Sequence, residues 1–307
     1  PRVEKCGYLC VCGFACAFRE SWVTFVAMQQ CGTVMALRCS TITGEKRMER
    51  ALPENGHKSA SSTDVEALAH ALADSARRTA LAYFRQPLDV ESKDDLSPVT
   101  IADRKIEAEM RALLAERHPT AGVFGEEMGA DNADAGEVWV LDPIDGTGAY
   151  VTGSPLFGCL VGLLIDGQPE LGLIEVPRLG ERWFASRGGP AILNGRRCQS
   201  SGRTRLAEAS LGTTSLLAMG EGERDGFLRA ARRARLTRFG GDCYTYALVA
   251  SGYLDAVVEI GLQPYDYLPV VPVVEAAGGV MTDWSGAPLG LRSDGRVIAA
   301  ASPALHD

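Results

Sequence analysis

Apolar residues return every three or four positions between residues 65 and 81, as they do on one face of an amphipathic helix. The polar segment 61–63 precedes Glu66 at the spacing of a capping box, in which side chains bond the free backbone groups at a helix start. We therefore predict a helix that begins in this segment and ends before Pro87.

A second helix is predicted after Thr100. Asp103 stands three residues later, and Ile106, Met110 and Leu114 supply the apolar stripe. Asp103 therefore lies in the first turn of this helix. Its simplest role there is to complement the helix dipole, which contributes about 0.3–1 kcal/mol.

The pattern then changes to that of β-strands. Short apolar runs at 121–124 and 138–141 are followed by a strand-rich stretch from residue 157 to residue 185. Asp166-Gly167 and Asn194-Gly195 are dipeptides typical of two-residue hairpin turns. This stretch is therefore predicted to form antiparallel sheet.

The C-terminal third alternates between strands and helices, which is typical of an α/β arrangement. The predicted strands span 209–213, 256–260, 280–282 and 297–301, and the predicted helices span 222–235, 243–251 and 266–275. Pro272 is expected to bend the last helix. We divide the main domain, residues 60–307, into a half with antiparallel sheet (60–200) and a C-terminal α/β half (201–307).

Residues 1–59 differ from the rest and are set apart as a leader, disordered or outside the mature fold. They hold six of the nine cysteines, and their apolar run at 7–18 is too short to span a membrane. A targeting peptide and a stretch upstream of the true start both remain open. We expect a cytoplasmic protein, with plastid or other targeting as the alternative.

The main domain is acidic. After residue 59 the chain has 34 Asp and Glu against 23 Lys and Arg, within a composition that is 46% hydrophobic and ordinary for a globular protein. This balance argues against nucleic acid as a partner, because Lys and Arg hold phosphate backbones. It suits a site that collects divalent cations.

The most specific short motif is DPIDGT, from Asp142 to Thr147, directly after the apolar run 138–141. Its two carboxylates would repel each other at a bare turn, so a cation between them explains their pairing. Pro143 fixes the backbone, and Gly146 allows close approach to a ligand. The alternative is an ordinary solvated turn.

Other acidic residues also fall at predicted strand ends or helix starts, where ligands meet the backbone in α/β proteins. Together the set is Asp103, Glu126, Glu127, Asp142, Asp145 and Asp266. An all-oxygen set suits Mg²⁺. The four histidines are scattered away from it, which weakens a Ser-His-Asp hydrolase or a zinc protease.

Such a set indicates metal-assisted hydrolysis of a phosphate ester, since two metal ions can bind the phosphate and activate a water. Thr147 and Asp103 are the candidates for orienting that water. Backbone N–H groups at Gly146, Thr147 and Gly148 are expected to bind phosphate oxygens if they begin a helical turn. The predicted partner is a small phosphate monoester.

Four motifs, in this order, resemble the inositol monophosphatase superfamily of Mg²⁺-dependent phosphatases. They are GEE at 125–127, WVLDPIDGT at 139–147, PYDY at 264–267 and EAAGG at 275–279. The resemblance covers about residues 62–302. It implies a layered α-β-α-β-α sandwich, two or three Mg²⁺ ions and a homodimer.

The resemblance also implies roles for single residues. The implied metal ligands are Glu126, Asp142, the carbonyl of Ile144, Asp145 and Asp266. Asp103 and Thr147 would position the attacking water. Glu127 would assist catalysis from just outside the metal or bind it weakly.

Within the superfamily, residues 240–252 and 261–286 resemble the histidinol-phosphate phosphatase branch. This likeness implies that Asp242 and Glu259 face the substrate's amino and hydroxyl groups, and a charge-assisted bond to an amine would reject uncharged polyols. The alternative role for Asp242 is to cap the helix behind it. The expected reaction converts L-histidinol phosphate to L-histidinol and phosphate, in histidine biosynthesis.

Two other functions remain open. An inositol-1-phosphate or broad sugar phosphatase would use the same metal site. A metal-binding regulator without catalysis is suggested by Gly148-Ala149, where the family usually has Lys or Thr followed by Ser or Asn.

Overall fold

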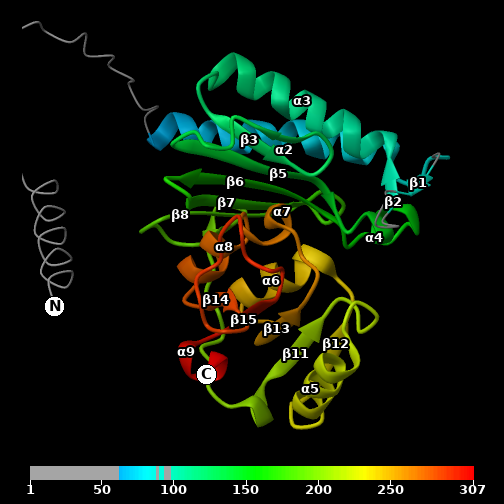
Figure 1. The fold of residues 1–307 in the computed structure, drawn as a ribbon, viewed down its shortest axis with the longest axis vertical. Helices are drawn as coiled ribbons and strands as arrows, with labels where there is room; N and C mark the ends of the chain where they lie inside the picture. The colour runs from blue at the N-terminus through cyan, green and yellow to red at the C-terminus, as the bar shows by residue number, and fades with distance from the viewer. Residues whose placement is uncertain (1–61, 88–89, 93–97) are drawn as a thin grey trace, which may run out of the picture. The chain divides into compact units, whose positions relative to one another are not determined.

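Two β-sheets and the helices around them make up most of the part of the chain that the structure describes (Figure 1). The computed structural model describes residues 62–87, 90–92 and 98–307. The expectations for the leader 1–59, and for Ser61 in the predicted capping box, concern residues outside this part. Within it, no helix is long and apolar enough to cross a lipid bilayer.

The larger sheet contains the predicted hairpins. Its strands are β3 (Gly122–Gly125), β4 (Gly129–Asp131), β5 (Glu137–Asp145), β6 (Gly158–Ile165), β7 (Gln168–Val176), β8 (Glu181–Ser186), β9 (Ile192–Leu193) and β10 (Arg196–Arg197). They lie in the order β10-β9-β8-β7-β6-β5-β3-β4, with β3 and β5 parallel and the other neighbours antiparallel. Asp166-Gly167 and Asn194-Gly195 turn at positive φ between antiparallel strands, as predicted.

Two long helices, both predicted, lie together on the larger sheet (Figure 1). α2 (Ser62–Tyr83) contacts β6 and β7, and α3 (Ile101–Arg117) contacts β5 and α2. A short ribbon of β1 (Val90–Ser92) and β2 (Pro98–Thr100) leads into α3. α3 begins with a complete capping box, because Thr100 Oγ1 accepts from the Ala102 N–H and Asp103 Oδ2 accepts from the Thr100 N–H.

β5 is longer than the strand predicted over 138–141. It continues through the DPIDGT motif to Asp145, and its pairing with β6 becomes irregular between Asp142 and Asp145. Irregular pairing changes the direction of side chains and is frequent beside functional sites. The strand therefore ends at the two carboxylates. The helix α4 (Thr147–Val151) follows directly.

The smaller sheet belongs to the C-terminal third. Its strands are β11 (Ser210–Thr213), β12 (Leu236–Phe239), β13 (Ala256–Glu259), β14 (Val280–Asp283) and β15 (Val297–Ala300), in the order β12-β11-β13-β15-β14. Its helices are η1 (Leu206–Glu208), α5 (Glu221–Ala231), α6 (Asp242–Ala250), α7 (Pro264–Tyr267), α8 (Val271–Ala276) and α9 (Pro303–His306). β11 pairs in parallel with β12 and β13.

Several elements of this third differ from the prediction. The helix predicted over 222–235 ends at Ala231, and the edge strand β12 was not predicted. The helix predicted over 266–275 is interrupted, and forms α7 and α8. The interruption lies against the larger sheet, where a Cβ added to Gly172 would come 2.0 Å from the carbonyl oxygen of Pro269.

The hydrophobic cores lie between these layers. One core joins α2 and α3 to the larger sheet and contains Ile106 and Trp139. Another joins the opposite face of that sheet to α6, α7 and α8 and contains Trp183 and Tyr246. A third, with Phe227, lies between α5 and the smaller sheet. The resulting order of helices, sheet, helices, sheet and helices confirms the predicted α-β-α-β-α sandwich (Figure 1).

Candidate functional site

Three carboxylates from two distant segments meet at the end of β5. Oxygen atoms of Asp142, Asp145 and Asp266 all lie within 4.8 Å of one another. Asp142 and Asp145 stand at the irregular end of β5, and Asp266 lies in α7. α7 packs against β5 and β6, and Pro269, just after it, lies close to Gly172 of β7. The fold therefore gathers three of the predicted metal ligands.

Burial raises the pKa of each of these three carboxyl groups. Asp142 is 1% exposed, and burial followed by the charge of Glu126 raises its pKa well above the usual value. Burial and the charge of Asp266 raise the pKa of Asp145 to about 7. Burial also raises the pKa of Asp266 to about 7, against a hydrogen bond from the Gln263 N–H. A cation would remove the repulsion that opposes their ionisation.

One oxygen of the group lacks a partner. Asp142 Oδ1 is buried and accepts no hydrogen bond within the part of the chain that the structure describes. An unsatisfied buried acceptor costs about 1–3 kcal/mol, and more when it is charged. The side-chain atoms nearby that could bind a metal ion are carboxylate oxygens, the ligands that hard cations such as Mg²⁺ prefer. The residues present therefore fit a divalent metal ion.

Glu126 and Glu127 follow β3, the parallel neighbour of β5. The Glu126 carboxylate is near enough to those of Asp142 and Asp266 for its charge to raise both pKa values. Neither Glu126 nor Glu127 belongs to the 4.8 Å group. The structure thus brings Glu126 beside the three aspartates and leaves Glu127 as its half-buried neighbour in the chain.

Asp103, Thr147 and the carbonyl of Ile144 lie together next to this group. The Thr147 hydroxyl is 3.0 Å from the carbonyl oxygen of Ile144 and 3.4 Å from Asp103 Oδ1. The other Asp103 oxygen, Oδ2, accepts from the Thr100 N–H at 2.9 Å and from the Thr100 hydroxyl at 2.6 Å. Asp103 therefore caps α3 with one oxygen and faces Thr147 with the other.

The segment from Gly146 to Gly148 begins a helical turn. The phosphate contacts predicted for its backbone N–H groups required such a turn. Gly146 has φ 78° and precedes the first residue of α4. A Cβ on Gly146 would lie 2.8 Å from Asp242 Oδ2, so both the backbone and its neighbour require glycine here. Asp242 is thus in direct proximity to the DPIDGT turn.

Asp242 and Glu259 line a pocket of about 220 Å³ together with Asp145 and Asp266. The cap of α6 is Gly241 and includes no side-chain hydrogen bond, so the alternative in which Asp242 caps this helix is wrong. Asp242 has φ 46°, a conformation uncommon for a residue other than glycine and frequent at functional sites. Burial, then the charges of Asp145 and Glu259, raise the pKa of Asp242 to about 8.

Glu259 is held firmly in this pocket. Its Oε1 accepts from the Thr214 N–H at 2.7 Å, and its Oε2 accepts from the Tyr246 hydroxyl at 2.9 Å. Burial raises the pKa of Glu259, although both hydrogen bonds oppose the shift. Asp145 is also fixed from this side, because its Oδ2 accepts from the Cys243 N–H at 2.5 Å.

Sequence reasoning missed the residues that complete this pocket. Thr213 and Thr214 line it, and their hydroxyl oxygens are buried with no hydrogen-bond partner among the described residues. Tyr246 lies on the facing helix α6. The position of Thr213 at the C-terminal end of a parallel strand was a usable signal, because ligands bind at such ends.

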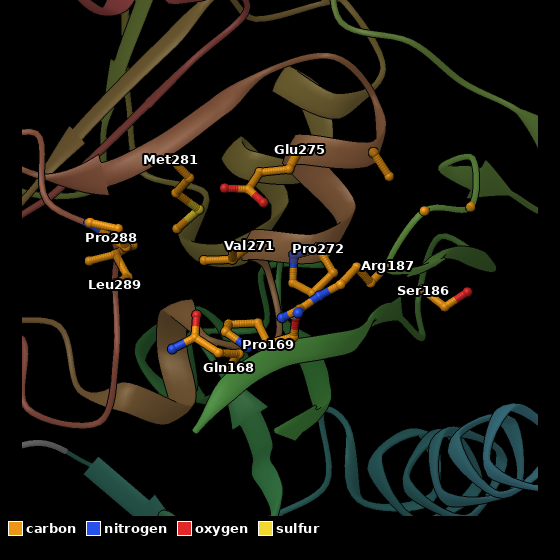
Figure 2. A pocket seen from close by; sticks show the side chains of 13 residues that line it. Gln168, Pro169, Ser186, Arg187, Val271, Pro272, Glu275, Met281, Pro288 and Leu289 are labelled. Carbon is orange, nitrogen blue, oxygen red and sulfur yellow. The ribbon is translucent and has the colours of Figure 1, made fainter. Parts of the chain in front are cut away.

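A larger cavity, of about 640 Å³, lies between α8 and the ends of β7 and β8. Figure 2 shows that its walls mix apolar side chains such as Val271, Met281 and Leu289 with the charged Arg187 and Glu275. It contains none of the predicted site residues. Size alone therefore does not identify the functional pocket in this fold.

Comparisons with known proteins agree with the motifs. A model of the inositol monophosphatase family matches residues 61–307. The chain is 44% identical over 222 residues to the chloroplastic bifunctional phosphatase IMPL2 of Arabidopsis thaliana, covering 72% of this chain and 64% of that protein. The match thus spans less than two thirds of the Arabidopsis protein.

Two further relatives are covered almost completely. The chain is 38% identical over 242 residues to a histidinol-phosphatase of Chlorobaculum parvum, covering 76% of this chain and 90% of that one. The solved structure of an inositol monophosphatase from Zymomonas mobilis is 43% identical and superposes with a TM-score of 0.74, covering 81% and 96%.

Proposed function

The chain belongs to the inositol monophosphatase family, and from this premise we propose that it is a Mg²⁺-dependent phosphomonoesterase whose substrate is L-histidinol phosphate. The products are L-histidinol and phosphate, and the reaction serves histidine biosynthesis. One observation carries the choice of substrate. Asp242 and Glu259 form a second acidic pair in the pocket that also contains Asp145 and Asp266.

The proposed metal site holds two or three Mg²⁺ ions. Its ligands are Glu126, Asp142, the carbonyl of Ile144, Asp145 and Asp266. When bound, Mg²⁺ neutralises phosphate oxygens and lowers the pKa of water. This assignment is supported by Asp142 Oδ1, which has no hydrogen-bond partner among the described residues, and by the three aspartates, whose oxygens lie within 4.8 Å of one another.

The chain's own groups orient the reactants. The Thr147 hydroxyl, between the Ile144 carbonyl and Asp103, holds the attacking water, and Asp103 fixes the direction of that hydroxyl. N–H groups from Gly146 to Gly148 bind phosphate oxygens at the start of α4. Glu127 assists from just outside the metal ligands.

An amine on the substrate explains the second acidic pair. An ammonium group beside Asp242 and Glu259 would offset the repulsion that helps to raise the pKa of Asp242 to about 8. A charge-assisted hydrogen bond is roughly twice as strong as a neutral one. A neutral polyol leaves these two carboxylates without a cation and is rejected.

Hydrolysis of inositol 1-phosphate is the second candidate. It is favoured by the 43% identity to the structure described as an inositol monophosphatase. Both reactions use the same metal site and differ in what Asp242 and Glu259 contact. We also propose that the protein is a homodimer, which light scattering of the purified protein would measure.

The test is a comparison of kcat/KM for L-histidinol phosphate and inositol 1-phosphate, with and without Mg²⁺. We expect Mg²⁺-dependent turnover with a preference for histidinol phosphate. A preference for inositol 1-phosphate would refute the proposed substrate. Mg²⁺ binding without turnover of any monoester would favour the regulator.

Asp242→Asn tests the contact directly. A hydrogen bond to a charged group contributes about 1.5–3 kcal/mol, so kcat/KM for histidinol phosphate should fall on the order of 10–100-fold. The value for inositol 1-phosphate should change little. Asp225→Asn, on the exposed side of α5, is the matched control and should alter neither.

A further inference from the structure

Helix α3 contacts two of the three segments that carry the proposed metal ligands. Asp103, Glu107 and Arg111 are spaced four residues apart and therefore lie on one face of the helix. Asp103 reaches Thr147, in the turn after β5. Glu107 and Arg111 reach the turn after β3, which carries Glu126.

Glu107 is completely buried, which is rare for a glutamate without a special function. Its Oε2 accepts from the Glu127 N–H at 2.7 Å, and its Oε1 accepts from the Met128 N–H at 3.1 Å. Arg111 Nε donates to Oε1 at 2.8 Å and supplies the counter-charge. Arg111 Nη2 also donates to the carbonyl of Gly129. Together these two side chains bond three successive residues of one turn.

The strand before this turn passes very close to the Glu107 carboxylate. A Cβ added to Gly125 would lie 2.2 Å from Glu107 Oε1. Gly125 is therefore required for the carboxylate to approach the backbone this closely. The Glu107 carboxylate accepts from the first two N–H groups after Glu126. It therefore fixes the backbone directly after Glu126, and with it the direction of the Glu126 side chain.

Helix stability alone does not explain this arrangement. An i, i+4 pair such as Glu107 and Arg111 contributes about 0.2–0.5 kcal/mol on a helix surface, and there it needs no burial. Apolar residues fill a core at least as well as a buried ion pair does. An apolar residue at position 107 could not accept the hydrogen bonds from the backbone next to Glu126, which is a proposed metal ligand.

We propose that Glu107 is a positioning residue that fixes residues 126–128 so that the Glu126 carboxylate reaches the cation bound by Asp142 and Asp266. This inference rests on the proposed metal site and not on the identity of the substrate. Arg111 supports Glu107 by holding its carboxylate and by bonding Gly129.

The test is calorimetric titration of the full, metal-free chain with Mg²⁺ in the absence of substrate. Glu107→Gln keeps the size of the side chain but leaves one acceptor oxygen for three donors. Loss of an outer hydrogen-bonding partner of a metal ligand typically costs 10–100-fold in affinity, so we expect the Mg²⁺ dissociation constant to rise roughly by that factor. Glu109→Gln is the matched control, because Glu109 lies on the same helix and bonds Thr79 and Ser75 instead.

Ile106→Val, at the neighbouring core position, shows whether a general loss of stability could by itself weaken Mg²⁺ binding. This variant should lower the melting temperature without altering the Mg²⁺ affinity.

If Glu107→Gln does not fold, Arg111→Gln replaces it and should weaken Mg²⁺ binding several-fold. A folded Glu107→Gln chain, or a folded Arg111→Gln chain where it is used instead, that binds Mg²⁺ within about two-fold of the wild-type chain would overturn the inference. So would a wild-type chain that binds no Mg²⁺. Mg²⁺ binding without hydrolysis of histidinol phosphate would refute only the proposed substrate.

Discussion

The Asp103 carboxylate makes one contact within its own helix start and another with Thr147. Its Oδ2 completes the capping box of α3, and its Oδ1 faces the Thr147 hydroxyl. Two roles were expected for Asp103: stabilising the start of a helix, and, by family resemblance, positioning the attacking water. These roles use different oxygens of the same carboxylate. Capping fixes the side chain, and a fixed side chain is better able to direct Thr147.

Thr147 provides a prediction at this scale. Thr147→Val keeps the shape of the side chain but removes the hydroxyl, so the attacking water loses its proposed partner. We expect kcat to fall on the order of 100-fold or more, as for loss of a group that positions or polarises a reactant. Thr147→Ser keeps the hydroxyl and should retain most of the activity.

The measurement is steady-state turnover of the preferred monoester at saturating Mg²⁺. Thr152→Val is the control, because its hydroxyl donates to the carbonyls of Gly148 and Ala149 and does not contact Asp103 or Ile144. Similar kcat values for Thr147→Val and the wild-type chain would remove Thr147 from the proposed chemistry.

Some residues of the site could be predicted from sequence because they stand in compact motifs. DPIDGT places two carboxylates, a glycine and a hydroxyl in six positions, and the structure brings both of these carboxylates to Asp266. Glu107 could not be found in this way. A glutamate in an amphipathic helix ordinarily faces solvent, and only the close approach of Gly125 reveals that this one is buried.

At the scale of elements, a buried glutamate also attaches α2 to the larger sheet. Glu175, on β7, is fully buried and accepts from Arg77 Nε of α2 and, at 2.6 Å, from Arg182 Nε of β8. Arg182 Nη2 then donates to Asp74 of α2 at 2.7 Å. The helix is thus joined to two strands by charge as well as by its apolar stripe.

Glu175→Gln should therefore loosen this attachment. The amide offers one acceptor oxygen to two guanidinium groups, and breaking a buried pair costs about 3–5 kcal/mol. Because the Arg77 side chain is 33% exposed, we expect the free energy of unfolding to fall by a smaller amount, about 2–3 kcal/mol. Urea denaturation of the metal-free wild-type and variant chains measures this change in the free energy of unfolding.

Glu170→Gln is the control on the same strand. Glu170 pairs with Arg187 at 3.2 Å, and both side chains are substantially exposed, so its loss should cost less than about 1 kcal/mol. Equal losses in the two variants would show that the buried network adds nothing to the attachment of α2.

Helices and turns with local signals were predictable, and elements set by distant contacts were not. The capping box of α3 and the two hairpin dipeptides are encoded within a few residues. The bend expected at Pro272 is instead a complete break between α7 and α8, where Pro269 lies close to Gly172 of another element. β12 is an edge strand whose Leu236 and Phe239 are about half exposed, so it lacks the alternation that identifies a strand.

At the scale of the whole molecule, the site joins the two sheets. Asp142 and Asp145 end a strand of the larger sheet, Glu259 ends a strand of the smaller one, and Asp242 begins a helix between them. The bond from the Cys243 N–H to Asp145 links the two sides directly. Metal binding here should therefore stabilise the described fold as a unit, because both sides must be in place to form the site.

Protons and Mg²⁺ should each stabilise the folded chain, but the two effects should change with pH in opposite directions. Asp145 and Asp266 have pKa values raised to about 7, so between roughly pH 4 and pH 7 the metal-free folded chain binds more protons than the unfolded chain. Its stability therefore falls as the pH rises through this window. Mg²⁺ replaces these protons, so its stabilising effect should grow as the pH rises.

The melting temperature provides the measurement, with EDTA or with excess Mg²⁺, at pH 5 and pH 8. Mg²⁺ at about 100 times its dissociation constant stabilises by about 2.7 kcal/mol, or roughly 5–10 °C for a chain of this size, at pH 8. At pH 5 the same Mg²⁺ concentration should give a smaller shift, because protons compete for the carboxylates. Asp145→Asn removes one titrating ligand, so both the Mg²⁺ effect and its pH dependence should shrink. Equal Mg²⁺ shifts at the two pH values would mean that the gathered carboxylates do not bind the ion.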